Sequence, residues 1–132
     1  MKYLFVLILP LLQSFSASAQ LDSAAIVSVT ETQIVDTADL EYPMSQISFE
    51  IFINDFDFLG EIVITVIENE TGYPLGMVKK SKIDIEQNNS FNSQTGVVTI
   101  SLEVYNTESI KNLRAVVRNY QGASLPYLDS SL

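Results

Sequence analysis

The alternation of apolar and polar side chains in VVTISLEVY, residues 97–105, constrains the fold of this chain more than any other feature. The aliphatic residues at positions 98, 100, 102 and 104 fall on one side of an extended chain, and Thr99, Ser101 and Glu103 fall on the other. A period of two is the period of a β-strand and not of a helix. The same period recurs in ISFEIFI (47–53) and LRAVVRNY (113–120).

Three further segments also predict strands. IVSVTETQIV (26–35) is a first strand or strand pair, and EIVITVIE (61–68) is apolar on both faces, which is typical of the middle of a sheet. YPLGMVKKSKIDI (73–85) predicts a strand in which Pro74 marks a sheet edge or a strand start, after a tight hairpin loop at NETG (69–72). We expect residues 86–96 to form a polar loop and the tail after Gly122 to pack loosely, and no convincing helix follows the amino-terminal segment.

This pattern predicts an all-β protein, a single antiparallel β-sandwich of about six to seven strands of the immunoglobulin-like kind. The predicted core residues share the inward phase of their strands: Phe49, Ile51, Ile64, Val66, Val98, Ile100, Leu102, Val104, Leu113 and Val117.

The amino terminus, MKYLFVLILPLLQSFSASAQ, predicts a secretory signal peptide over residues 1–19. Lys2 supplies the positive charge, the apolar stretch is too short to span a membrane, and Ala17 and Ala19 supply the small residues before the cleavage site. Residues 20–132 then form one β-sandwich domain, exported to the periplasm or the cell exterior. No later stretch is long enough to span a membrane, and no cysteine follows the cleavage site to carry a lipid.

The chain contains no histidine and no cysteine. These absences exclude disulfides, thiol chemistry, Ser-His-Asp catalysis and most zinc and copper sites, and we expect no cofactor. The formal net charge is −9, with 16 acidic and 7 basic residues, and becomes −10 once Lys2 is removed with the leader. Such a surface repels nucleic acid, so nucleic acid is not an expected partner.

An acidic stretch, IFINDFDFLG (51–60), is the strongest candidate for metal binding. Asn54, Asp55, Asp57 and Glu61 offer oxygen ligands of the type that calcium takes. Their spacing departs from the twelve-residue calcium loop, and the apolar phase switches across Asn54 and Asp55 as it does where a strand ends. We therefore expect a corner between strands and no metal site, with Asp55, Asp57 and Glu61 as the residues that a metal would use.

Two other groups are candidate contact surfaces. Lys79, Lys80 and Lys82 are half of the positive charge of residues 20–132. They suit an anion or polyanionic glycan, or they guard a sheet edge against pairing with other chains, which we favour. Phe52, Val63 and Ile67 lie opposite the regular core stripes of their strands and form a candidate partner surface, unless they line the core and the face assignment is inverted.

The layout resembles the secreted immunoglobulin-like and fibronectin-type-III-like sandwiches of bacterial surface proteins. VIENETGYPLG (66–76) resembles the strand–turn–strand of carboxypeptidase-regulatory-like domains, and QTGVVTI (94–100) resembles the next strand entry of that family. The chain lacks the aspartate expected before the second glycine, and it has no cysteine pair and no tryptophan. Both resemblances imply a β-sandwich module without catalytic activity.

These observations predict a non-catalytic binding or assembly module, with another extracytoplasmic protein or a surface glycan as its partner. The alternative is a structural or adhesin-like cell-surface component that self-associates through a sheet face or edge. A small carboxylate-dependent hydrolase comes third, because paired carboxylates such as Asp55 and Asp57 suit glycoside hydrolysis.

Overall fold

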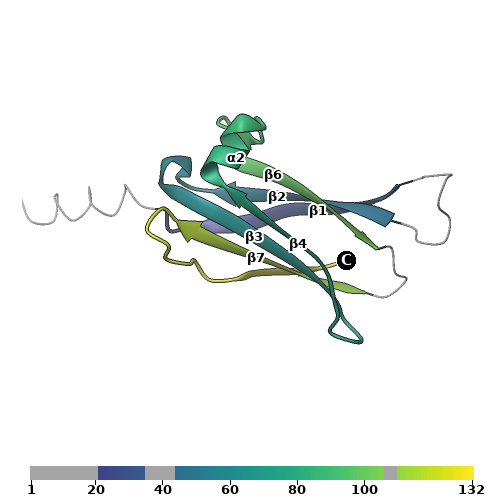
Figure 1. Ribbon diagram of the computed structural model, residues 1–132. Helices are drawn as coiled ribbons and strands as arrows, with labels where there is room; N and C mark the ends of the chain where they lie inside the picture. Colours follow the sequence, from purple (N-terminus) through teal and green to yellow (C-terminus); the bar gives the residue numbers. More distant parts are fainter. Residues whose placement is uncertain (1–20, 35–43, 106–109) are drawn as a thin grey trace, which may run out of the picture.

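Two four-stranded antiparallel sheets face each other in the computed structural model, which describes residues 21–34, 44–105 and 110–132 (Figure 1). Sheet A has the order β1-β2-β6-β5, and sheet B has the order β4-β3-β7-β8. The strands of sheet A are β1 (Ala24–Ile34), β2 (Met44–Ile53), β6 (Val97–Tyr105) and β5 (Phe91–Asn92). Those of sheet B are β4 (Pro74–Ser81), β3 (Leu59–Glu68), β7 (Lys111–Asn119) and β8 (Leu128–Ser131). The predicted all-β sandwich is confirmed.

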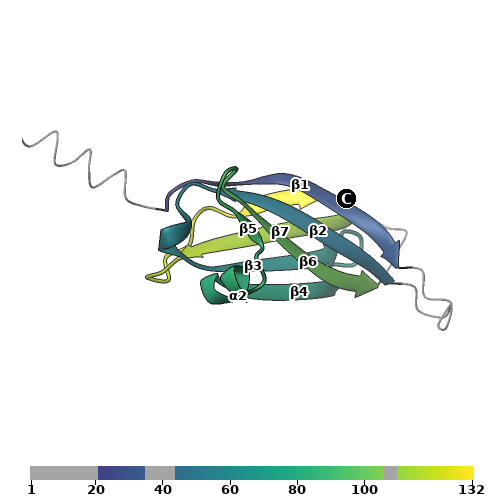
Figure 2. The same cartoon turned by 90° about the horizontal axis from the view of Figure 1, so that it is seen from above.

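Each sheet consists of two pairs of consecutive strands joined side by side. The pair β1–β2 meets the pair β5–β6 where β2 lies against β6, and β3–β4 meets β7–β8 where β3 lies against β7. In the view from above, sheet A lies over sheet B (Figure 2). The predictions that β3 is central and that the strand beginning at Pro74 is an edge strand are both confirmed.

The inward stripes of the two sheets form one hydrophobic core. All ten residues predicted for the core are buried. Ile47, Ile53, Leu59, Ile62 and Ala115 extend the same stripes and are buried as well. The core comes mainly from β-branched side chains, which pack well on a pleated surface. In β2 the apolar residues of the alternating pattern, Ile47, Phe49, Ile51 and Ile53, face the core, as the sequence indicates.

The prediction of a strand throughout residues 73–85 is wrong, as is the absence of a helix. The strand β4 ends at Ser81, and a short helix α2 (Lys82–Gln87) follows. The Ser81 side chain accepts a hydrogen bond from the Asp84 N–H at 3.2 Å, and Asp84 accepts one from the Ser81 N–H at 3.1 Å. This reciprocal capping box starts a helix. Within the described ranges, no helix is long and apolar enough to cross a membrane.

Two segments expected to be irregular contain strands. The polar loop 86–96 includes β5, which pairs with the start of β6. The tail includes β8, which pairs with β7 from Asn112↔Ser131 to Ala115↔Leu128. The predicted leader (1–19), most of the connection at 36–44 and part of the turn at 106–112 lie outside the described residues.

The corner predicted after β2 is present, although its centre is helical rather than extended. Residues Phe56–Phe58 form a single 3-10 turn, labelled η1, which Asp55 caps. Asp55 Oδ1 accepts the N–H of Asp57 at 3.2 Å. Phe56 and Phe58 are partly buried and pack against the core, while Asp57 is exposed.

Two glycines allow parts of the chain to approach closely. A Cβ atom on Gly60 would lie 2.3 Å from the carbonyl oxygen of Asn119, where β3 begins beside the end of β7. A Cβ atom on Gly76 would lie 2.9 Å from Val104 Cγ1, across the sandwich between β4 and β6. The second contact brings the two sheets together along the β4–β6 side.

An ion pair joins the two sheets near their other side. Lys111 on β7 places its Nζ 3.1 Å from Glu31 Oε1 on β1, and its side chain is only 4% exposed against 23% for Glu31. Amphipathic lysine is seldom buried to this degree without a charged partner. The pair therefore fixes β1 of sheet A against β7 of sheet B.

Candidate binding groove

A groove of about 1240 Å³ begins on the outer face of sheet A. Glu50 on β2 and Thr99 and Ser101 on β6 line its floor, and the turn between β5 and β6 forms one wall. The groove continues past the edge of β6 to the end of α2 and to Lys80 on β4.

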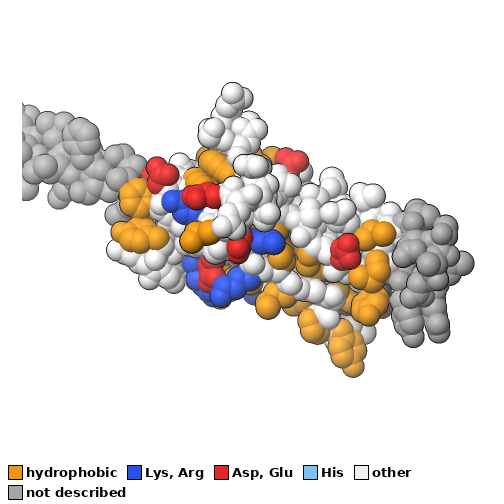
Figure 3. Space-filling model, turned by 45° about the horizontal axis from the view of Figure 1, so that its top comes forward, with side chains coloured by type: hydrophobic (Ala, Val, Ile, Leu, Met, Phe, Trp, Pro, Cys, Tyr) orange, Lys and Arg blue, Asp and Glu red, His pale blue; other side chains and the backbone are white. Residues whose placement is uncertain are grey.

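The lining of the groove is rich in uncharged polar side chains. Three asparagines, three serines, two threonines and one glutamine line it, with Glu50 and Lys80 as the charged residues. In Figure 3 the part of the molecule that projects at the top is mostly white, the colour of uncharged polar side chains and backbone. Asn, Gln, Ser and Thr side chains both donate and accept hydrogen bonds. The groove can therefore bind a neutral ligand that also carries donors and acceptors.

The β5–β6 turn that forms this wall is held by local hydrogen bonds. Asn92 Oδ1 accepts the N–H of Gln94 at 2.9 Å and that of Thr95 at 3.3 Å. The turn closes with Gly96 at a φ of 73°, a conformation that glycine adopts readily. Phe52 of β2 lies directly beneath Gly96, because a Cβ atom there would meet its ring at 2.9 Å. The β5–β6 turn is therefore held in place by its own hydrogen bonds and by its contact with Phe52 of sheet A.

The other wall is anchored to the core. Ile85 of α2 is buried, and its carbonyl accepts the N–H of Ser90 at 3.0 Å as the helix ends. Phe91 then stacks on Phe56 of η1, with ring centroids 4.1 Å apart. The sequence patterns did not predict this groove. The signal was present in NNSFNSQT (88–95), which leads directly into β6, but Val27 on β1 and Glu50 on β2 lie far away in sequence.

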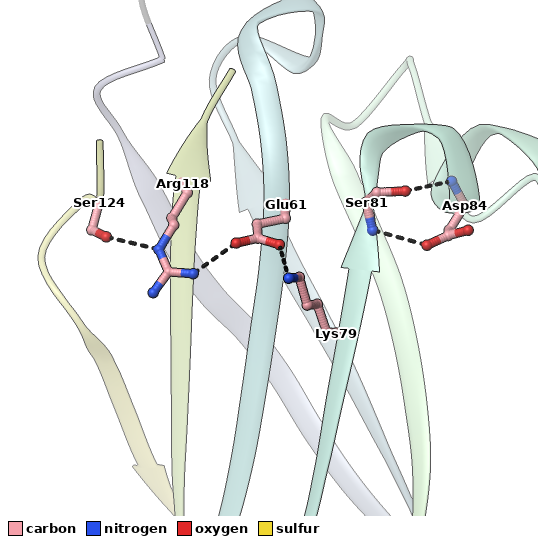
Figure 4. A network of polar contacts seen from close by, with 6 residues as sticks. All are labelled: Glu61, Lys79, Ser81, Asp84, Arg118 and Ser124. Atoms are coloured by element: carbon pink, nitrogen blue, oxygen red, sulfur yellow. Dashed lines mark hydrogen bonds and ion pairs between the residues drawn. The ribbon is translucent and has the colours of Figure 1, made fainter. Parts of the chain in front are cut away.

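A second polar arrangement lies on the outer face of sheet B (Figure 4). Glu61 on β3 accepts a hydrogen bond from Arg118 Nη1 at 2.7 Å and lies 3.1 Å from Lys79 Nζ. Arg118 also donates from Nε to Ser124 Oγ at 3.2 Å. The hydrogen bond from Arg118, followed by that from Lys79, holds the pKa of the Glu61 carboxyl below its ordinary value of 4.5. Glu61 therefore links two cationic side chains across β4, β3 and β7.

Protonation of Glu61 is expected to weaken the fold in acid. A carboxyl whose pKa is lower in the folded state stabilises that state above its unfolded pKa, and this stabilisation is lost as the pH falls through the folded-state pKa. Glu61→Gln removes this titration. Thermal unfolding at pH 7 and at pH 3 should show a smaller acid-induced drop in Tm for the variant than for the wild type. Equal drops would show that other groups account for the acid sensitivity.

The residues suggested for a metal have separate roles. Asn54 Oδ1 accepts the N–H groups of Asp22 and Ser23, each at 3.1 Å. Asp55 caps η1, and Glu61 is paired with Arg118 and Lys79. Among residues 21–34, 44–105 and 110–132, no three acidic side chains are grouped so that they could hold a metal ion.

Calcium is expected to leave the stability unchanged. Ca²⁺ needs 6–8 oxygen ligands, and tight binding to the folded state would raise Tm by mass action. Thermal unfolding in millimolar CaCl₂ and in chelator should give the same midpoint. A rise of many degrees that Asp55→Asn abolishes would contradict this prediction.

The three lysines do not form one patch. Lys79 faces outward beside Glu61, whereas Lys80 lines the groove. Lys82 lies on α2 with its Nζ 3.6 Å from Glu86 and 5.7 Å from the ring centroid of Phe56. Lys79 and Lys80 do lie on an edge strand, the position for which the guarding role was suggested.

The candidate apolar surface is divided between the two sheets. Phe52 lies on the outer side of sheet A beneath Gly96, while Val63 and Ile67 lie on the outer side of sheet B. All three are partly buried. Arg114 and Arg118 on β7 pair with Asp129 and Glu61, as expected for a solvated sheet surface.

The fold and the groove define a β-sandwich with a neutral polar groove on one sheet. No protein-family model matches the chain, and no curated protein matches it. A solved structure described as Northeast Structural Genomics Consortium target SoR45 is similar over 83% of this chain and 84% of that chain, with 10% sequence identity and a TM-score of 0.40. A likeness at this level defines no family for the chain.

Proposed function

We propose that this protein is an exported, non-catalytic binding module of immunoglobulin-like type, whose ligand lies in the groove on sheet A. The observation that carries the proposal is the preformed polar groove itself. Binding sites are commonly concave and largely formed before the ligand arrives. Both walls here are fixed, one by the Asn92 turn over Phe52 and the other by buried Ile85.

The chemistry of the groove supports binding without turnover. Among the described residues that line the groove, Glu50 is the one carboxylate, whereas glycoside hydrolysis uses two. Structural contacts lower the pKa of two described carboxyls, Asp84 and Glu61. The pKa of Asp84 is lowered chiefly by the hydrogen bond that its carboxylate accepts from the Ser81 N–H at the start of α2. The pKa of Glu61 is lowered chiefly by its hydrogen bond from Arg118. The hydrolase hypothesis therefore receives no support from this groove.

A pelleting assay with cell envelopes of the source organism tests the proposal. The purified protein should co-sediment saturably with envelopes. Thr99→Trp fills the floor of the groove and should abolish co-sedimentation, whereas Thr65→Trp on the outer face of sheet B should not. A wild-type protein that stays in the supernatant, or a Thr99→Trp variant that still pellets, would overturn the proposal.

Export has its own test. The protein recovered outside the cytoplasm should have Gln20 as its first residue by intact-mass measurement, because Ala17 and Ala19 mark the cleavage site. Full-length chain confined to the cytoplasm would contradict export, and a different processed end would move the cleavage site.

Self-association is the second candidate function, and exposed apolar side chains favour it. Tyr73 and Met77 are 70% and 68% exposed at the β3–β4 hairpin, and Ile110 nearby is 57% exposed. The Asn69 N–H donates to the Ile110 carbonyl at 2.9 Å, which brings Ile110 to the same end of the molecule. Figure 3 shows hydrophobic side chains gathered at the lower right, where this hairpin projects.

Sedimentation velocity separates the two functions. If this end mediates assembly, the wild type should form oligomers with rising concentration, and Tyr73→Ser combined with Met77→Ser should remain monomeric. A wild type that stays monomeric at high concentration would exclude self-association as the function and leave the groove proposal intact.

A further inference from the structure

The groove on sheet A differs from the rest of the molecule in charge. The whole chain has a formal net charge of −9, yet the groove lining has one acid, Glu50, and one base, Lys80. A polyanion is repelled by the overall field, and a polycation would find only Glu50 to pair with. The charges therefore favour an uncharged ligand.

The side chains of the lining specify the ligand further. Amide and hydroxyl groups both donate and accept, as the hydroxyl groups of a sugar do. Protein partners, by contrast, usually bury aromatic or aliphatic anchors at the centre of an interface. The apolar lining here is mostly committed to the fold: Ile85 is buried in the core, and Phe91 is stacked on Phe56.

We infer that the groove binds a neutral oligosaccharide segment, an inference that rests on the proposed binding function and names its ligand class. Thr99 and Gln94 offer hydrogen bonds to sugar hydroxyl groups from the floor and the wall, and Val27 and Val97 offer a small apolar surface to the C–H face of a sugar ring. The volume of about 1240 Å³ exceeds that of a usual small-molecule site, about 300–1,000 Å³, and so accommodates more than one sugar ring.

Nuclear magnetic resonance tests this inference, since the chain has no tryptophan to report binding by fluorescence. ¹⁵N-labelled protein is titrated with six neutral hexasaccharides: cello-, malto-, xylo-, laminari-, manno- and N-acetylchito-hexaose. Oligogalacturonate and oligochitosan serve as the charged probes. At least one neutral hexasaccharide should shift the side-chain amide signals of Asn89 and Gln94 saturably, and the charged probes should not.

Matched variants locate the binding. Thr99→Val keeps the branched shape and removes the hydroxyl group, and Gln94→Leu removes the amide. Each should weaken binding by about threefold to tenfold, as expected for one lost hydrogen bond. Thr65→Val, on the outer face of sheet B, should bind as the wild type does. Unchanged thermal midpoints confirm that the variants fold.

Three results would overturn the inference: no shift with any neutral hexasaccharide, shifts with charged probes alone, or equal binding by the wild type and the Thr99→Val, Gln94→Leu double variant. Envelope pelleting separates this failure from failure of the proposed function. Envelopes stripped of protein by protease should still bind the wild type if the ligand is a glycan. If only untreated envelopes bind it, the groove takes a protein, and the glycan inference alone is wrong.

Discussion

Phe49→Ala should lower the free energy of unfolding by about 3–5 kcal/mol, the range found for truncating a buried phenylalanine. Phe49 is the largest of the fully buried side chains and lies on β2, with β1 on one side and β6 on the other. Its removal leaves a cavity that the rigid β-branched neighbours cannot readily fill. Since small domains have about 5–15 kcal/mol of stability in total, this loss is a large share of the stability of the fold.

Urea unfolding followed by circular dichroism measures this loss. Tyr73→Ala is the matched control, because it removes an aromatic ring that is 70% exposed and should change the stability by no more than about 0.5 kcal/mol. Similar losses in the two variants would contradict the placement of Phe49 at the centre of the core.

Glu31→Gln should lower the free energy of unfolding by about 3 kcal/mol. Breaking a buried ion pair by removing one partner typically costs about 3–5 kcal/mol, and the partial exposure of Glu31 and the further contacts of Lys111 reduce this cost. The change keeps the shape of the side chain and removes only its charge. The measurement is again urea unfolding at pH 7.

Lys111→Met is the informative comparison. The side chain of Lys111 is 4% exposed, so the charge left by Glu31→Gln lies farther from water than the charge left by Lys111→Met. Methionine also fills much of the volume of the lysine stem. Lys111→Met should therefore cost less than Glu31→Gln, and the reverse order would show that the pair is not buried as described.

The alternation of side chains predicted the sandwich because a strand with one buried face needs an apolar residue at every second position. Strands β2, β3, β6 and β7 are long and have clear inward stripes, and they form the centres of the two sheets. The same alternation also indicated correctly which face of β2 is buried. Edge strands show a weaker alternation, because they bury less apolar surface.

The elements that the sequence did not predict, α2, β5 and β8, lack a clear alternating pattern or have one that resembles another kind of element. In α2, Ile83 and Ile85 are two residues apart and suggested a strand, but Ile85 is buried and Ile83 is 63% exposed, as a helix requires. The Ser81 and Asp84 capping pair was the contrary signal. The two-residue strand β5 and the polar strand β8 exist through their pairing with β6 and β7, which no local pattern encodes.

The candidate site was harder to predict than the fold. The sequence drew attention to acidic and basic residues, yet Asp55 caps a turn and Glu61 is paired with Arg118 and Lys79. The groove combines uncharged residues of segment 85–101 with Val27 on β1, Glu50 on β2 and Lys80 on β4, so it is complete only when these strands are assembled.

The arrangement of each sheet as two joined hairpins also has a consequence for how the chain folds. Hairpins such as β3–β4 close over short loops and form within about 1–10 μs in isolated peptides. The pairings that unite them are distant, since Met44 meets Tyr105 and Glu68 meets Lys111. High contact order of this kind places refolding in the range of about milliseconds to seconds. The rate should therefore be set by the encounter of β2 with β6 and of β3 with β7, with the separate hairpins forming and breaking many times before those central seams close.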